Sequence, residues 1–93
     1  MTNLDLNNRH ICPVCGYPNL EEPPYDKYGC PSSEICPCCG TEFGYDDANI
    51  SHNELRNNWI IKGMKWYVKE KQPEGWDVNV QLKALGIKLD NLN

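Results

Sequence analysis

Two short cysteine motifs contain the residues of this chain that are best suited to chemistry. Residues 12–16 (CPVCG) and residues 36–40 (CPCCG) both follow the pattern C-P-x-C-G. Two residues between cysteines allow one tight turn to direct both sulfur atoms at a single ion, and two such pairs separated by about 15–20 residues are typical of a four-cysteine metal site. The sequence therefore predicts a tetrahedral metal centre whose ligands are Cys12, Cys15, Cys36 and Cys39.

Other uses of paired cysteines agree less well with this sequence. Disulfides are unusual in reducing compartments, and the polar, acidic start of the chain does not resemble a signal peptide. A thioredoxin-like redox motif carries one C-x-x-C pair, whereas this chain has two. We therefore expect reduced thiols and a bound metal ion in a cytoplasmic protein.

The identity of the metal is a separate question, because tetrahedral sulfur ligation suits both zinc and iron. Both cysteine motifs are similar to those of rubredoxin, which surrounds its iron with aromatic residues from the spacer between the motifs. Here the spacer, residues 18–35, contains only Tyr25 and Tyr28 as aromatic residues. We predict one zinc ion per chain, with a rubredoxin-like iron centre for electron transfer as the alternative.

Two further cysteines, Cys30 and Cys38, are not needed for a four-ligand site. We expect both to be small, half-buried residues without a chemical role. Two alternatives stay open. A reversible disulfide between Cys30 and Cys38 would respond to oxidation, or one of these cysteines, or His10, would replace one of the four ligands.

Alternating apolar and polar residues flank both motifs and predict short antiparallel strands on either side of each. Metal-binding turns between short strands are typical of zinc ribbons and of rubredoxin. The predicted fold class is therefore a small α+β protein, in which a zinc-ribbon or rubredoxin-like pair of knuckles precedes one long helix and a short C-terminal helix. We expect a single domain, residues 1–93, with a metal-binding region at 9–47 and a helical region at 51–93.

The long helix is predicted to begin after Ser51, because Ser51 and Glu54 form a capping-box pattern. Apolar residues then recur with helical spacing over residues 55–71, and Pro73 ends the pattern. The apolar arc is wider than the contact with one core requires. Either another segment of this chain or a separate molecule must therefore cover part of this helix.

The C-terminal segment is one candidate for that cover. Asp77 can act as the N-cap of a short helix over residues 78–85, and Gly86 can end it. Val78, Leu82 and Leu85 would then face inward.

A protein partner, or a second copy of the chain in a homodimer through the helix at residues 55–71, is the other candidate. We expect such a partner to meet either the helix or the aromatic and acidic loop before it. The predicted partner surface consists of Phe43, Tyr45, Asp46, Asp47, Ile61, Met64 and Val68.

Charge and composition argue against a membrane span and against nucleic acid as a partner. The 93-residue chain has a net charge of −4, and its longest uninterrupted apolar run is three residues, far short of a membrane span. Residues 1–51 hold two basic and eight acidic side chains, which disfavours nucleic acid as a partner of the metal-binding region. A nucleic-acid-associated zinc ribbon that uses Lys62, Lys65 and Lys69 is the alternative.

The sequence also argues against an enzyme. Four cysteine ligands leave no open position on the metal for a substrate, and no catalytic triad or glycine-rich phosphate loop is recognisable. We therefore expect a structural zinc site that supports a protein-interaction module.

The sequence around both motifs resembles the bacterial cysteine-rich CPCC family. The resemblance rests on residues 12–17, Glu22-Pro23-Pro24, residues 33–40 and the acidic pair Asp46-Asp47, and it covers about half of the chain. It implies a small zinc-binding protein without enzymatic activity, in which Cys12, Cys15, Cys36 and Cys39 are the motif cysteines.

Overall fold

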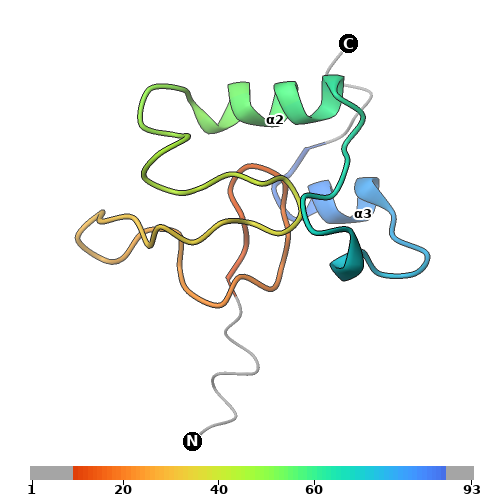
Figure 1. The fold of residues 1–93 in the computed structure, drawn as a ribbon, viewed down its shortest axis with the longest axis horizontal. Helices are drawn as coiled ribbons and strands as arrows, with labels where there is room; N and C mark the ends of the chain where they lie inside the picture. Colours follow the sequence, from red (N-terminus) through yellow and green to blue (C-terminus); the bar gives the residue numbers. More distant parts are fainter. Residues whose placement is uncertain (1–9, 88–93) are drawn as a thin grey trace, which may run out of the picture.

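The computed structural model describes residues 10–87, and the helices occupy the second half of this range. In chain order they are the α-helix α2 (His52–Ile61), the short 3-10 helix η1 (Lys69–Lys71) and the α-helix α3 (Val78–Lys83). Figure 1 shows α2 and α3 beside the irregular segments that carry the cysteines. Helices α2 and α3 are each attached to those segments by side-chain hydrogen bonds, and there is no extensive α2–α3 interface within residues 10–87.

The two cysteine motifs form tight turns, which we call the first knuckle (residues 12–16) and the second knuckle (residues 36–40). Single antiparallel bridges close their bases, His10 with Leu20 and Ile35 with Glu42. The predicted strands are therefore reduced, within residues 10–87, to isolated residue pairs. Pro23 and Pro24 follow Leu20 closely, and proline cannot donate a hydrogen bond to a ladder.

Helix α2 begins where the sequence predicts. Ser51 is its N-cap, and the Ser51 Oγ accepts a hydrogen bond from the Glu54 backbone N–H at 3.1 Å. Trp59 and Arg56 are the buried residues of this helix, while Ile61 is 81% exposed at its end.

The prediction that this helix continues to residue 71 is wrong, because α2 ends at Ile61. Gly63 has φ +101° and Met64 has φ +55°, and the Met64 N–H donates to the Trp59 carbonyl at 2.9 Å, as in a Schellman-type helix end. Beyond this turn the backbone N–H groups of Tyr67 and Val68 donate to carbonyls of the second knuckle. Hydrogen bonds to a distant segment thus replace those that a longer helix would form.

The early helix end also changes two predicted surfaces. Ile61 lies at the end of α2, and Met64 and Val68 are half-buried in the segment that follows, so these three residues do not form one helix face for a homodimer. The lysines at 62, 65 and 69 lie in a helix cap, an irregular segment and η1 respectively, so helical spacing does not align them either.

Helix α3 agrees more closely with the sequence pattern. Asp77 is its N-cap and accepts a hydrogen bond from the Asn79 N–H at 2.9 Å, and Leu82 is fully buried. The C-terminal segment does fold back, as one of the two alternatives predicted. Trp76 packs edge-to-face against Trp59 at a centroid distance of 6.4 Å and against Trp66 at 5.4 Å.

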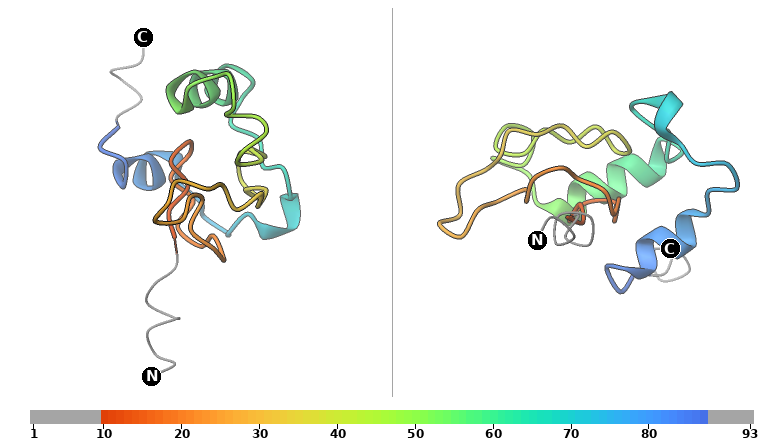
Figure 2. Two further views of the ribbon diagram at one scale, coloured as in Figure 1. Left: turned by 90° about the vertical axis from the view of Figure 1, so that its left-hand side faces the viewer. Right: turned by 90° about the horizontal axis from the view of Figure 1, so that it is seen from below.

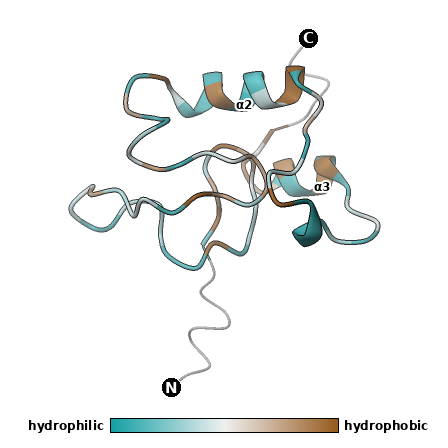
Figure 3. Ribbon diagram, in the orientation of Figure 1, coloured by the Kyte–Doolittle hydropathy of each residue, from teal (hydrophilic) through white to brown (hydrophobic). Residues whose placement is uncertain are grey.

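The core gathers where the knuckles meet these tryptophans. Its buried members come from both halves of the described chain: Cys12, Val14, Cys15, Leu20, Cys36, Cys38, Phe43, Trp59, Trp66 and Leu82. Figure 2 shows α2 and α3 approaching the knuckle segments from different sides, and Figure 3 shows hydrophobic residues in the knuckle segments and in both helices. No helix within residues 10–87 has the length and hydrophobicity that crossing a membrane requires.

Candidate metal centre

The four predicted ligands converge on one point in the core. The sulfur atoms of Cys12, Cys15, Cys36 and Cys39 all lie within 4.8 Å of one another. Across the two knuckles, Cys12 Sγ lies 3.8 Å from Cys39 Sγ, and Cys15 Sγ lies 3.6 Å from Cys36 Sγ. A tetrahedral ion with metal–sulfur bonds of about 2.3 Å has sulfur–sulfur edges of about 3.8 Å. The spacing of the four sulfur atoms therefore fits a tetrahedral metal ion.

Both knuckles obtain this geometry from the same backbone turn. In the first, the Gly16 N–H donates to the Cys12 carbonyl at 2.9 Å; in the second, the Gly40 N–H donates to the Cys36 carbonyl at 2.8 Å. Gly16 and Gly40 have φ values of +86° and +80°, which glycine adopts without a steric penalty. The repeated C-P-x-C-G pattern thus encodes two similar turns.

The thiols of the cluster are electrostatically coupled. Burial raises the pKa of Cys15, because a thiolate in the core loses its hydration. A hydrogen bond with Cys12 raises the pKa of Cys36, and a hydrogen bond with Cys12 lowers the pKa of Cys39, since that thiolate is the acceptor. Four thiolates at this spacing repel one another, so a cation at the centre of the cluster is the natural way to keep all four deprotonated.

Arg56 is the main supporting residue of the first knuckle, and the sequence analysis did not identify it. Its Nε donates to the Val14 carbonyl at 2.7 Å, its Nη2 donates to the Pro13 carbonyl at 2.8 Å, and its Nη1 donates to Asn53 Oδ1 at 2.7 Å. Desolvation by burial lowers the Arg56 pKa, and the nearby charges of Cys12 and Cys15 oppose this effect. Arg56 therefore both fixes the knuckle and offsets its negative charge.

Gln81 on α3 supports the same knuckle from another side. Its Nε2 donates to the Cys15 carbonyl at 2.9 Å and lies 3.4 Å from Cys38 Sγ, while its Oε1 accepts from Trp76 Nε1 at 2.9 Å. The helix approaches so closely that a Cβ on Gly16 would lie 2.5 Å from the Gln81 carbonyl oxygen. Gly16 is therefore needed for this contact as well as for its own turn.

The remaining cysteines occupy different environments. Cys38 is fully buried beneath Gln81. Cys30 is exposed in a loop, where its backbone N–H donates to Asp26 Oδ1 at 2.9 Å. None of the six cysteines forms a disulfide. The structure therefore does not form the disulfide between Cys30 and Cys38, and it gathers neither residue, nor His10, into the four-sulfur cluster.

The loop predicted to meet a partner is largely occupied by internal contacts. Phe43 is 1% exposed and packs against Tyr25, so its assignment to a partner surface is wrong. The Asp47 side chain is 2% exposed and bonds to His52 Nε2 at 2.9 Å, and Asp46 accepts from the Glu42 N–H at 2.8 Å. The turn that buries Phe43 directs Tyr45 outward, where it is 74% exposed.

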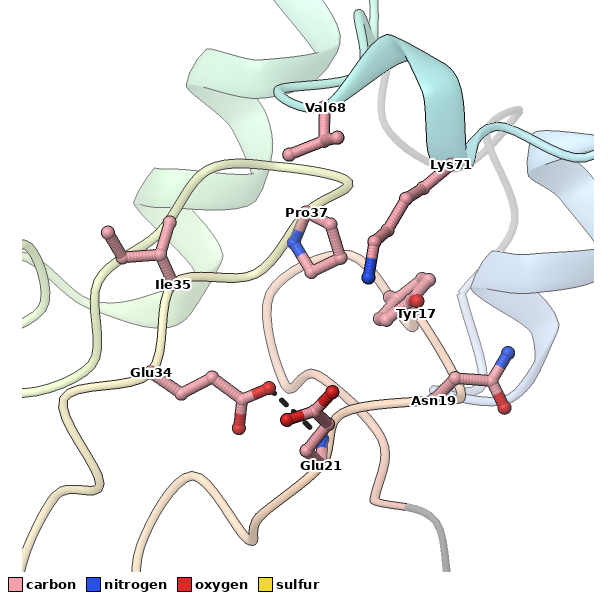
Figure 4. A pocket seen from close by; sticks show the side chains of 8 residues that line it. All are labelled: Tyr17, Asn19, Glu21, Glu34, Ile35, Pro37, Val68 and Lys71. Carbon is pink, nitrogen blue, oxygen red and sulfur yellow. Dashed lines mark hydrogen bonds between the residues drawn. The ribbon is translucent and has the colours of Figure 1, made fainter.

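A surface pocket of about 600 Å³ lies between the second knuckle, η1 and the segment after the first knuckle. Figure 4 shows the Lys71 ammonium near Tyr17 on one side and the carboxylates of Glu21 and Glu34 on the other. The Glu34 carboxylate accepts hydrogen bonds from the backbone N–H groups of Glu21 and Glu22, at 3.0 and 3.1 Å. Glu34 therefore serves to hold the loop at residues 21–22.

Two proteins of Bacillus subtilis (strain 168) are similar to this chain in sequence. Uncharacterized protein YozI is 32% identical in an alignment that covers 70% of this chain and 68% of YozI. Uncharacterized protein YoaQ is 46% identical in an alignment that covers 56% of this chain and 42% of YoaQ. No protein-family model matches the chain, and no solved structure matches it. Membership of the CPCC family therefore stays a prediction.

Proposed function

We propose that this chain, which belongs to the family of the uncharacterized protein YozI of Bacillus subtilis, holds one zinc ion through four cysteines and acts without catalysis as a protein-interaction module. The observation that carries the proposal is the convergence of the four sulfur atoms of Cys12, Cys15, Cys36 and Cys39 within 4.8 Å. A bound ion would cross-link the two knuckles and stabilise a core that contains little regular secondary structure.

Zinc is favoured over iron by the spacer between the two knuckles. The two tyrosines of the spacer do not enclose the sulfur atoms. Tyr28 is 78% exposed, and Tyr25 packs against Phe43 and His52. A four-thiolate zinc site with no open position is structural rather than catalytic, which supports a protein that is not an enzyme.

The arrangement of the knuckles supports a fold of the zinc-ribbon or rubredoxin type, as proposed from the sequence. Both knuckles have antiparallel bridges at their bases, and their sulfur atoms face each other across the core. The fold that we propose is a small α+β unit, in which α2 and α3 follow the two knuckles.

A protein is the partner that the surface favours. Several large apolar or aromatic side chains remain exposed, among them Tyr28, Tyr45 and Ile61 at 78%, 74% and 81%. Aromatic residues are enriched where proteins meet other proteins. The net charge of −4 and the unaligned lysines disfavour nucleic acid.

Elemental analysis of the purified protein, combined with an absorbance spectrum, tests the metal assignment. We expect one zinc ion per chain and no absorbance in the visible. Iron with a coloured spectrum would promote the electron-transfer alternative. A protein that binds neither metal, even when reduced and refolded with zinc, would contradict the proposal.

A further inference from the structure

The four ligands of the metal centre are not equally buried. Cys12, Cys15 and Cys36 are 0% exposed, whereas Cys39 is only partly buried. Cys39 also differs in its hydrogen bonding, since its Sγ lies 3.3 Å from the Thr41 hydroxyl. One sulfur atom of the cluster therefore belongs to a residue near the protein surface.

Cys39 also contributes to a surface pocket of about 180 Å³ between the second knuckle and α2. The pocket is lined by Cys39, Gly40, Thr41, Asp46, Leu55, Asn58, Trp59 and Lys62. None of the other three ligands lines it. Because a water molecule occupies about 30 Å³ in the liquid, the pocket is large enough for a small ligand group as well as water.

We propose that this pocket is the route by which the metal exchanges, and that Cys39 is the ligand replaced by a small incoming thiol. The inference rests on the proposed zinc centre. The other three sulfur atoms belong to residues enclosed by the core, so they keep hold of the ion while Cys39 leaves.

The exchange is a ligand substitution without oxidation or reduction. A small thiol would take the place of Cys39 among the four ligands and its proton would pass to the Cys39 thiolate, while Cys12, Cys15 and Cys36 would hold the ion. The Thr41 hydroxyl, 3.3 Å away, can donate a hydrogen bond to Cys39 Sγ while the sulfur is still a thiolate.

Alkylation of the zinc-loaded protein with iodoacetamide tests whether the four cysteine ligands differ in accessibility. Cys30→Ser serves as the background, because Cys30 is exposed and lies outside the cluster. Mass spectrometry of the singly modified species identifies the first residue to react. We expect Cys39; first modification at Cys12, Cys15 or Cys36 would overturn the proposal.

A matched pair of substitutions on α2 tests the route itself. Asn58 lines the pocket and Asn57 does not, while both are exposed residues in the middle of the same helix. We measure zinc transfer to a chromophoric chelator at rising concentrations of 2-mercaptoethanol. Asn58→Trp should slow the thiol-dependent rate by roughly tenfold, equivalent to an added barrier of about 1.4 kcal/mol. Asn57→Trp should leave it unchanged.

Equal rates for the two variants, or a rate in the parent protein that does not depend on thiol concentration, would contradict the route. Failure of the proposed function is distinguishable from these results, because a protein without a structural metal gives no zinc to transfer. In that case the order of alkylation still decides whether Cys39 is the accessible member of the cluster.

Discussion

The two knuckles have the same sequence pattern and nearly the same internal hydrogen bonds, yet the rest of the molecule holds them in different ways. Arg56 and Gln81, from α2 and α3, donate side-chain hydrogen bonds to carbonyls of the first knuckle. The second knuckle receives mainly backbone hydrogen bonds, from Tyr67 to the Cys38 carbonyl at 3.0 Å and from Val68 to the Pro37 carbonyl at 2.8 Å, besides the longer contact of Gln81 Nε2 with Cys38 Sγ at 3.4 Å. Similar turns therefore depend on different parts of the sequence.

This difference determines which substitutions each knuckle tolerates. A backbone N–H is supplied by any residue except proline, so the support of the second knuckle is largely independent of the side chains at 67 and 68. The support of the first knuckle requires one guanidinium and one amide in fixed positions. We therefore expect side-chain substitutions outside the motifs to affect the first knuckle more strongly than the second.

The largest effect should follow from removal of a metal ligand, because both knuckles then lose the ion that joins them. Cys15→Ser should abolish zinc binding and unfold the knuckle region, since structural zinc contributes an apparent free energy of about 10–16 kcal/mol in small zinc-binding peptides. Cys38→Ser is the matched control, as Cys38 is equally buried but lies outside the cluster. Zinc content and circular dichroism are the measurements. Zinc loss from Cys38→Ser with retention by Cys15→Ser would mean that the ligands are wrongly assigned.

Arg56→Met should have the next largest effect, because it removes the two hydrogen bonds that the guanidinium donates to the first knuckle. Each hydrogen bond from a charged donor contributes about 1.5–3 kcal/mol, and the Val14 and Pro13 carbonyls would lose their partner. We expect the free energy of unfolding of the zinc-loaded protein to fall by about 3 kcal/mol in denaturant titrations.

Val68→Thr tests the other half of this comparison. It keeps the backbone N–H that bonds to the Pro37 carbonyl at 2.8 Å and changes only the side chain. The free energy of unfolding should fall by about 1 kcal/mol or less. If Val68→Thr destabilises the protein as much as Arg56→Met does, the two knuckles are not supported in the different ways described above.

Much of the site could be predicted from the sequence because it is encoded locally. The repeated cysteine motif specifies each turn, and the structure brings the four predicted ligands together. Ser51 and Asp77 likewise identify both helix starts, since an N-cap acts on the residues directly after it.

The features that the sequence analysis missed depend on contacts between distant segments. Gly63 was the local sign of a helix end, but the apolar spacing beyond it was consistent with a longer helix. The backbone N–H groups of Tyr67 and Val68 bond to the second knuckle instead of continuing the helix. No local sequence pattern reveals these bonds. Arg56 left only a faint sign: it lies three residues before the buried Trp59 and hence on a neighbouring part of the helix surface.

The substitutions Gly16→Ala and Gly40→Ala test a smaller difference in stability between the two knuckles. Both substitutions incur about 1–2 kcal/mol for an alanine at positive φ. At Gly16 the new Cβ would also lie 2.5 Å from the Gln81 backbone carbonyl oxygen, whereas at Gly40 it would lie 3.1 Å from the side chain of Tyr67. A side chain can move aside more easily than a helix backbone. Gly16→Ala should therefore destabilise the protein more than Gly40→Ala, by about 1 kcal/mol in thermal or denaturant unfolding.

A reversed order, or equal losses, would show that α3 adjusts its position more readily than Tyr67 does. Comparison with Gln81→Ala decides whether the difference comes from this contact. Gln81→Ala keeps the backbone carbonyl that Gly16 approaches, so Gly16→Ala should remain the more harmful glycine substitution in that background.

A similarly small effect should follow from Asp77→Ala, which removes the N-cap of α3 without changing any contact to the knuckles. Loss of an N-cap costs about 1 kcal/mol. Because α3 carries Gln81, which bonds to the Cys15 carbonyl at 2.9 Å and reaches the second knuckle only through Cys38 Sγ at 3.4 Å, fraying of α3 should loosen the first knuckle more than the second. Amide hydrogen exchange should therefore accelerate more at the N–H of Gly16 than at that of Gly40, whose knuckle is supported mainly by the segment before η1. Ser51→Ala, which removes the N-cap of α2, should act in the same direction, because α2 carries Arg56, which bonds to the first knuckle. If Asp77→Ala accelerates exchange equally at both glycines, the two knuckles open together and their separate supports do not act independently.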